Sequence, residues 1–222
     1  MSSVPNYTVV PITKDDIPTI GTFLQDSKLQ LAINRFLIKD WPNEPVQKAL
    51  YTGAIEGGVK STQTTSLKVM SDASGLPVAH LFYTKTKSRT SASDEPTTGG
   101  TEGRNDNKVP AGVIPEVYWT VIDAVEELKP DFNTEEYMEL THIYVEPSSR
   151  GQGIGSWLVR IAQEDATAAG LPFSICAEPN HHGFFLNRGF KDVKKFDVEL
   201  TKWAAPLSGY GTFRISRMVM EK

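Results

Sequence analysis

Short stretches of the first third of the chain carry the period-2 pattern of strands. Residues 7–12 read as one strand, and residues 65–71 and 77–84 as two more, because apolar residues alternate with polar ones or form a short apolar run. The segment Asp72-Ala-Ser-Gly75 between the last two has the residue types of a tight turn. The pattern therefore predicts a hairpin.

Helical spacing marks two other segments of this region. Thr13 and Asp16 have the spacing of a capping box, and apolar residues recur every three or four positions from Ile17 onwards. A second helix is expected to begin near Asn43. The apolar segment 29–41 between the two is compatible with a helix or with irregular structure.

The second half of the chain alternates helices and strands. We expect helices at 115–128, 151–169 and 180–188, and strands at 137–145, 173–177, 192–200 and 212–220. Gly170 and Pro172 end the long central helix. The order is mixed α/β, with a single strand–turn–helix unit at its centre.

One segment differs from its surroundings. Within 87–110 the only hydrophobic residues are Ala92 and Val109, so the segment has too little apolar surface to offset the entropy of ordering it. The segments on both sides predict one sheet. We therefore expect a single domain over 1–222 with a flexible insertion at 87–110.

Composition excludes several classes of protein. The 222 residues are 39% hydrophobic and 23% charged, as in a globular protein that needs no disulfide or metal to fold. The net charge is −4 and no basic stripe is visible, which argues against a nucleic-acid partner.

The N-terminus and the cysteine content bear on the compartment. The single cysteine, Cys176, excludes an intramolecular disulfide and a cysteine-rich zinc site and suits a reducing interior. The N-terminus lacks the features of a secretory signal, and no apolar run reaches the roughly 20 residues of a membrane helix. We expect a cytoplasmic protein, with a nuclear location still open, that binds no metal or membrane and is a monomer or homodimer.

The strongest functional signal follows the strand that ends at Val145. It is the run Arg150-Gly151-Gln152-Gly153-Ile154-Gly155, which opens the central helix. The first N–H groups of a helix lack internal partners and lie at the positive end of its dipole, so they attract anions. The glycines leave room for a phosphate, and Arg150 supplies a guanidinium. The run predicts a phosphate site.

Other phosphate motifs fit less well. A Walker loop needs Lys and then Ser or Thr after its last glycine, but Gly155 is followed by Ser156-Trp157. In the dinucleotide fingerprint the third glycine would come one residue later. The glycines could also serve only to pack the helix against the strand. Arg150 and the strand–helix context favour the anion site.

This run, preceded by Val145-Glu146-Pro147, resembles the pyrophosphate loop of the GNAT acyltransferases. The resemblance continues through 177–180 and through 184–190, whose Gly189-Phe190 is similar to the end of the family's last helix. It covers about 138–190, and within the family it is to fungal-type small-molecule or uncharacterised members. It implies the GNAT-like acyl-CoA N-acyltransferase fold, in which helices flank a central, mixed, mostly antiparallel sheet of the α/β (α+β) class.

The resemblance also implies acetyl-CoA as the cosubstrate. The loop would hold its pyrophosphate, the strand before the loop would hold the pantetheine and polarise the thioester, and Asn180 would contact the pantetheine. Asn180 alone could equally be a helix cap. The expected cofactor-binding residues are Ile143, Tyr144, Val145, Arg150, Gly151, Gln152, Gly153, Ile154, Gly155, Ser156 and Asn180.

Glu139 is the expected catalytic base, because several family members place a glutamate at this position of the strand. Alternation puts Glu139 on the same face as Ile143 and Val145, and His142 on the opposite face. A carboxylate beside apolar side chains ionises less readily and is suited to accept a proton. The alternative is a solvent-exposed glutamate near the start of the strand.

The group that would donate a proton to the departing thiolate of CoA is less well defined. The family usually has a tyrosine four residues before the glycine of its Gly-Phe ending, and here that residue is Phe185. Tyr144, His181, His182 or water could replace it. A donor could also be dispensable, because a thiol with a pKa near 8.5 leaves readily as thiolate.

Two functions remain in competition. The first is an enzyme that transfers an acetyl group from acetyl-CoA by direct attack of a primary amine, on a small molecule or, as a second choice, on a protein or peptide. The acceptor would be bound by 15–57 and 200–215. The second is a CoA-binding regulatory or interaction protein with little or no turnover, which Phe185 would favour. Transfer of a longer acyl group is a third possibility.

Overall fold

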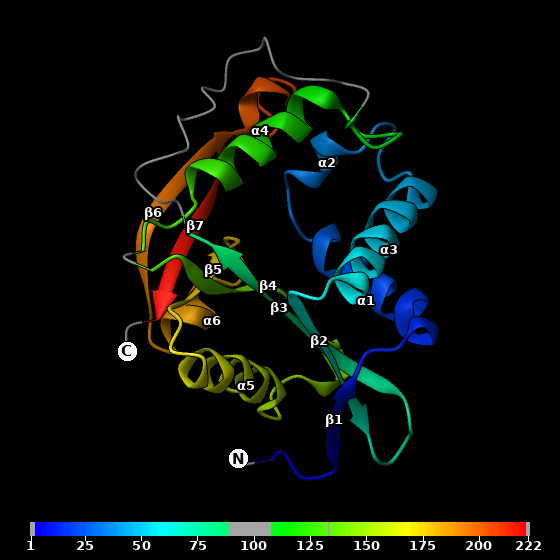
Figure 1. Cartoon of the computed structure of the whole chain (residues 1–222). Helices are drawn as coiled ribbons and strands as arrows, with labels where there is room; N and C mark the ends of the chain where they lie inside the picture. The colour runs from blue at the N-terminus through cyan, green and yellow to red at the C-terminus, as the bar shows by residue number, and fades with distance from the viewer. Residues whose placement is uncertain (1–2, 89–107, 133, 221–222) are drawn as a thin grey trace.

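The computed structural model describes residues 3–88, 108–132 and 134–220. In these ranges seven strands form one sheet in the order β1-β2-β3-β4-β5-β7-β6 (Figure 1). β4 and β5 are parallel, and all other neighbours are antiparallel. The sheet is therefore mixed and mostly antiparallel, as predicted. The strands are β1 (Tyr7–Pro11), β2 (Thr64–Ser71), β3 (Pro77–Lys87), β4 (Glu136–Val145), β5 (Phe173–Ala177), β6 (Phe190–Glu199) and β7 (Thr212–Met220).

Helices cover both faces of the sheet (Figure 1). The α-helices are α1 (Ile17–Leu29), α2 (Asn34–Leu37), α3 (Glu44–Lys60), α4 (Pro115–Glu127), α5 (Ile154–Ala168) and α6 (His182–Leu186). Short 3-10 helices are η1 (Lys14–Asp16), η4 (Pro147–Ser149) and η5 (Leu200–Lys202). The first four α-helices pack on one face, and α5 and α6 pack on the other.

The face that carries α5 holds a large apolar core. Leu81 of β3 and Leu140 of β4 pack there with Leu158 and Ala162 of α5, and all four side chains are buried. Apolar residues of α5 recur every three or four positions, so one side of the helix faces the sheet. This packing fixes the start of α5 next to the end of β4.

The opposite face is covered by two separate groups of helices. Phe82 and Tyr144 pack against Ile20 of α1 and Ile55 of α3. Farther along the sheet, Val117 of α4 belongs to a cluster with residues of β6 and β7. α1 and α4 therefore lie over different strands.

Most predicted elements are confirmed to within three residues, and the differences have local causes. α5 begins at Ile154 and not at residue 151, because Gly151 and Gly153 have φ of +78° and +86° and cannot be helical. The undecided segment 29–41 contains the short helix α2. The capping box is present, since the Thr13 N–H donates to the carboxylate of Asp16 over 2.7 Å, and it opens η1 just before α1.

A β-bulge interrupts the pairing of β3 with β4. Phe82 pairs with His142, but the next residue of β3, Tyr83, pairs with Leu140. Thr141 is the extra residue of β4, and its hydroxyl donates to the Phe82 carbonyl over 3.2 Å.

The bulge corrects one prediction about β4. Simple alternation placed Glu139 with Ile143 and Val145, and His142 on the other face. The extra residue reverses the alternation, so that Glu139 and His142 share the face toward α1. Ile143 and Val145 pack on the α5 side, so the predicted grouping is wrong.

The predicted flexible insertion, 87–110, lies mostly outside the described residues, at 89–107. The expectation of one domain with a flexible insertion stays a prediction. None of the helices in the described part of the chain is long and apolar enough to cross a membrane.

Candidate active site

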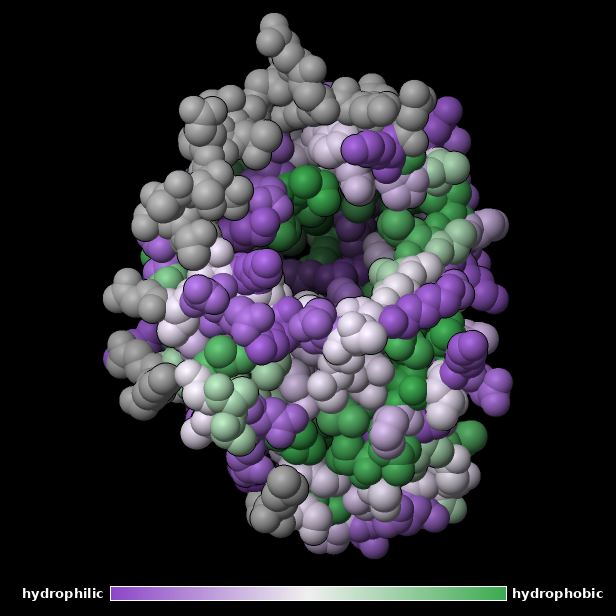
Figure 2. All heavy atoms as spheres, in the orientation of Figure 1, coloured by the Kyte–Doolittle hydropathy of each residue, from purple (hydrophilic) through white to green (hydrophobic). Residues whose placement is uncertain are grey.

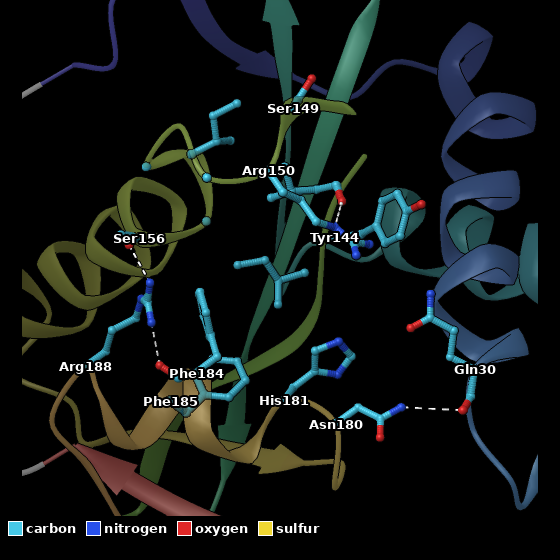
Figure 3. Close-up of a pocket in the computed structure, with 16 residues that line it drawn as sticks. Gln30, Tyr144, Ser149, Arg150, Ser156, Asn180, His181, Phe184, Phe185 and Arg188 are labelled. Atoms are coloured by element: carbon cyan, nitrogen blue, oxygen red, sulfur yellow. Dashed lines mark hydrogen bonds between the residues drawn. The ribbon is translucent and has the colours of Figure 1, made fainter. Parts of the chain in front are cut away.

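A first cavity of about 600 Å³ lies where the end of β4, the turn after it, the start of α5 and the region of α6 meet (Figure 3). All predicted cofactor-binding residues line it except Gln152, whose side chain accepts a hydrogen bond from the Tyr7 hydroxyl over 2.8 Å. The lining also includes residues that the sequence did not single out, namely Gln30, Ser149, Phe184 and Arg188.

The glycines of the turn have two different uses. A Cβ added to Gly151 or Gly153 would meet no other atom within 4 Å, so it is the positive φ that requires glycine there. A Cβ on Gly155 would lie 3.2 Å from the ring of Phe184. Gly155 thus lets α5 approach the α6 region, while the space over the other two glycines is open.

The turn presents unused backbone donors to this cavity. The first hydrogen bond of α5 runs from the Trp157 N–H to the Gly153 carbonyl over 2.9 Å. The preceding helical amides, of Ile154, Gly155 and Ser156, have no intrahelical partner, and all three residues line the cavity. Such an arrangement suits an anion.

Two arginines border the same space (Figure 3). Arg150 donates from Nε to the Val145 carbonyl over 2.9 Å, and its guanidinium lies 5.7 Å from the ring centre of Tyr144. These contacts hold the side chain beside the turn. Arg150 therefore adds a fixed positive charge to the backbone donors.

Arg188 is the second arginine and was missed by sequence reasoning. It donates from Nη2 to the Ser156 hydroxyl over 2.6 Å, and its guanidinium lies 3.4 Å from the ring centre of Phe184. Its only sequence signal was its place just before the Gly-Phe ending. The contact with Ser156 brings this charge to the first turn of α5.

β4 and β5 separate next to this cavity. They pair over three positions, Met138–Leu140 with Phe173–Ile175. Beyond these positions β4 continues to Val145, and no β5 residue pairs with it. Because alternate residues of a strand point their amides to opposite edges, part of the backbone of 141–145 is directed into the gap.

A second cavity of about 320 Å³ lies on the other side of this gap. In Figure 2 the molecule is hollowed between α4 and α1, and hydrophobic residues surround much of the opening. The lining is mostly apolar and comes from α1, α2, α3, α4, α6, β4, β5 and β7. Ile143, His181 and Phe185 line both cavities, so the two spaces meet at the point where the strands separate.

Charged side chains form part of the lining of the second cavity. Lys28 of α1 forms an ion pair with Glu178, and the His181 Nδ1 lies 3.5 Å from Oε2 of the same carboxylate. Burial would raise the pKa of Glu178, but Lys28 and His181 outweigh it and hold the pKa at about 2. Glu178 is therefore an anion at neutral pH.

His142 is the other titratable residue of β4 that lines the second cavity. Burial and the charge of Lys28 lower the pKa of His142 to about 4, although the negative charge of Glu178 acts in the opposite direction. The ring is neutral at pH 7. It packs edge-on against Phe82, with ring centres 5.9 Å apart.

Glu139 lies outside both cavities. Its Oε1 is 2.6 Å from Nη1 of the buried Arg217, and its Oε2 accepts a hydrogen bond of 3.3 Å from the Tyr137 hydroxyl. Burial opposes the charge of Arg217, but the Glu139 carboxylate outweighs it and raises the pKa of Arg217. Glu139 therefore neutralises a buried cation. The sequence had suggested that it lies among apolar side chains, and it does not.

The other candidates for the proton donor are placed differently. Phe185 is buried against Phe184 and Phe190. The ring of His182 is 2.8 Å from the Asp192 carboxylate, and His182 lines neither cavity. Tyr144 lines only the first cavity, and burial raises its pKa.

Part of the chain matches a known family. Residues 117–192, from α4 to the start of β6, match the family model of the acetyltransferase (GNAT) domain. No curated protein matches the chain significantly. The matched residues include β4, the glycine turn and α5, which build the first cavity.

Solved structures share the fold at low identity. Arylalkylamine N-acetyltransferase 2 from Aedes aegypti is 13% identical, with a TM-score of 0.64 over 97% of this chain and 100% of that one. A histone acetyltransferase HPA2 and related acetyltransferase from Corynebacterium glutamicum is 17% identical, with a TM-score of 0.54 over 98% and 97%. A chain of the NatC complex bound to Gag peptide and CoA is 11% identical, with a TM-score of 0.52 over 98% and 99%.

Residues 117–192 are therefore similar to the GNAT acetyltransferase domain, and the chain as a whole shares its fold with acetyltransferases of known structure. The narrower resemblance to fungal-type members has no support from these matches and stays a prediction.

Proposed function

We propose that the protein is an N-acetyltransferase that moves the acetyl group of acetyl-CoA to the primary amine of a small molecule. The observation that carries the proposal is the meeting of two cavities at the separated ends of β4 and β5. One cavity has an anion-binding turn and the other an apolar lining, so a charged donor and an apolar acceptor can reach the same point.

The donor would occupy the first cavity. The amides that open α5, with Arg150 beside them, would bind the diphosphate. The pantetheine would lie along β4 from Val145 toward Ile143 and near Asn180, whose side chain donates to the Gln30 carbonyl over 3.4 Å. The thioester would then reach the gap between β4 and β5.

The acceptor would occupy the second cavity. Its volume of about 320 Å³ is at the lower end of the range for sites that bind small molecules. Leu24, Leu37, Val121 and Phe213 contribute apolar surface, so an amine with an aromatic or aliphatic body fits better than a polyamine. This lining also favours a small molecule over a peptide.

The reaction needs little more than placement and a polarised carbonyl. The neutral amine attacks the thioester carbon, the C–S bond breaks, and an amide and a thiol are formed. Alignment of the two reactants can contribute ~7–11 kcal/mol to lowering the barrier. Backbone amides of β4 in the gap would stabilise the oxyanion, which is typically worth ~3–4 kcal/mol.

The alternative is a protein that binds CoA without turnover. The replacement of the expected tyrosine by Phe185 favours it, because Phe185 has no proton to give to the thiolate. An intact second cavity favours the enzyme, because a protein that only binds CoA does not need an acceptor site.

A thiol-release assay distinguishes the two. Acetyl-CoA is supplied with phenethylamine, hexylamine, spermidine and a lysine-containing peptide, and the product is identified by mass spectrometry. We expect the two apolar amines to be acetylated fastest. Calorimetric binding of CoA together with the absence of any acetylated product in the panel would contradict the enzyme and support the alternative.

A further inference from the structure

The site of bond formation has few residues around it. Donor and acceptor can react only where the first and second cavities meet, and three described residues line both, namely Ile143, His181 and Phe185. The side chains of Ile143 and Phe185 carry no exchangeable proton. His181 is therefore the residue of this set whose side chain, an imidazole, can both accept and donate a proton.

His181 is held in place from one side. Its Nδ1 faces Oε2 of Glu178 over 3.5 Å, and Glu178 is fixed by its ion pair with Lys28. A carboxylate at Nδ1 favours the tautomer that carries its proton there, which leaves Nε2 free to accept. In Figure 3 the ring of His181 is directed into the space between Phe185 and Gln30.

The backbone explains why His181 and Phe185 lie together. The Phe185 N–H donates to the His181 carbonyl over 3.3 Å, so the two residues are one helical turn apart and on one side of α6. A histidine here can serve the same point in space as a side chain at position 185.

We infer that His181, oriented by Glu178, is the proton-transferring catalytic residue at the junction of the two cavities. This inference rests on the proposed function. Its Nε2 removes a proton from the amine nitrogen as the N–C bond forms. The same proton passes to the thioester sulfur as the C–S bond breaks, so one proton moves from nitrogen to sulfur and the imidazole returns to its neutral form.

Other titratable residues near the junction do not line both cavities. His142 and Cys176 line the second cavity alone, and Tyr144 lines the first alone. His142 is buried on the face toward α1, where it packs on Phe82. Glu139 borders neither space and is paired with Arg217.

The test compares two adjacent histidines. His181→Gln keeps a polar side chain but removes the base, and we expect kcat to fall by roughly 10²- to 10⁴-fold with CoA affinity unchanged. His182→Gln is the matched control, because His182 is paired with Asp192 outside both cavities, and it should keep the wild-type kcat. Added imidazole should restore part of the rate of His181→Ala.

The outcomes separate this inference from the proposed function. Wild-type kcat in His181→Gln, or an equal loss in both variants, would overturn the role of His181 and leave the acetyltransferase standing. A loss of kcat in His181→Ala that added imidazole does not restore would indicate a structural role. That result would also overturn the catalytic role of His181. A wild-type protein that acetylates no amine of the panel would refute the proposed function itself.

Discussion

Nη1 of Arg217 on β7 lies 2.6 Å from Oε1 of Glu139 on β4, across the intervening strand β5. The guanidinium is buried and also donates to the Leu128 carbonyl over 2.9 Å and to the Ser174 hydroxyl over 3.1 Å. One side chain thus joins the end of α4 to three strands just below the gap. The pair fixes the part of β4 and β5 that stays joined.

Loss of one partner should therefore destabilise the fold more than it affects catalysis. Glu139→Gln leaves the Arg217 charge buried without a counter-ion, which typically costs about 3–5 kcal/mol. We expect a lower free energy of unfolding in urea and a kcat per folded molecule close to wild type. The double variant Glu139→Gln/Arg217→Met should recover much of the stability. A stable Glu139→Gln with a kcat reduced by orders of magnitude would instead make Glu139 the catalytic base.

Acid sensitivity should come partly from His80. Both of its ring nitrogens are buried and have no hydrogen-bond partner among the described residues. Burial, with the nearby charges of His142 and Lys28, lowers the pKa of His80 to about 3. In the unfolded chain the pKa is about 6.5, so the unfolded state binds the proton first. The contribution of His80 to the free energy of unfolding is therefore fully present above pH 6.5. Below pH 6.5 it falls by about 1.4 kcal/mol per pH unit.

His80→Leu, a change of similar volume, should remove one such contribution. The variant should lose less stability between pH 6.5 and pH 4 than the wild type, as measured by urea unfolding at several pH values. Identical pH dependence in the wild type and His80→Leu would show that His80 does not titrate in this way.

The second cavity can be narrowed from α4. Val121 lines it and is half-buried, so Val121→Trp should fill part of the space without disturbing the core. We expect the KM for phenethylamine to rise by roughly tenfold or more, because the larger side chain takes up room that the apolar body of the amine would fill. The affinity for CoA should be unchanged. Glu127→Trp, exposed on the same helix, should leave the KM unaltered. An unchanged KM in Val121→Trp would place the acceptor elsewhere.

Arg150 can be tested against an arginine of the same helix region. Arg150→Ala removes a guanidinium from the lining of the first cavity. It should weaken CoA binding by roughly 10- to 100-fold, as expected for a charged hydrogen bond of about 1.5–3 kcal/mol. Arg160→Ala, on α5 and outside that lining, is the control and should bind CoA like the wild type. Calorimetry at two salt concentrations measures both. Equal affinities of the two variants would exclude Arg150 from the phosphate site.

The fold and the turn were readable from the sequence because their signals are local. Strand and helix periods, and the glycines at 151 and 153, depend on neighbouring residues alone. The β-bulge at Thr141 and the pairing of Glu139 with Arg217, 78 positions apart, depend on cross-strand register. Register has no signature within a single segment, which is why the face of Glu139 was predicted wrongly.

The residues that line both cavities could likewise not be predicted from the sequence. His181 appeared there only as one of several possible proton donors. Its position relative to Glu178 and Lys28 depends on how α1 packs against the end of β5, and residue 28 is far from residue 178 in the chain.

The most direct measurement is a structure of the protein with CoA bound. We predict the diphosphate within hydrogen-bonding distance of the amides of Gly151 to Ser156, and the thiol at the gap between β4 and β5 near His181. A diphosphate bound elsewhere, with this turn empty, would contradict the account.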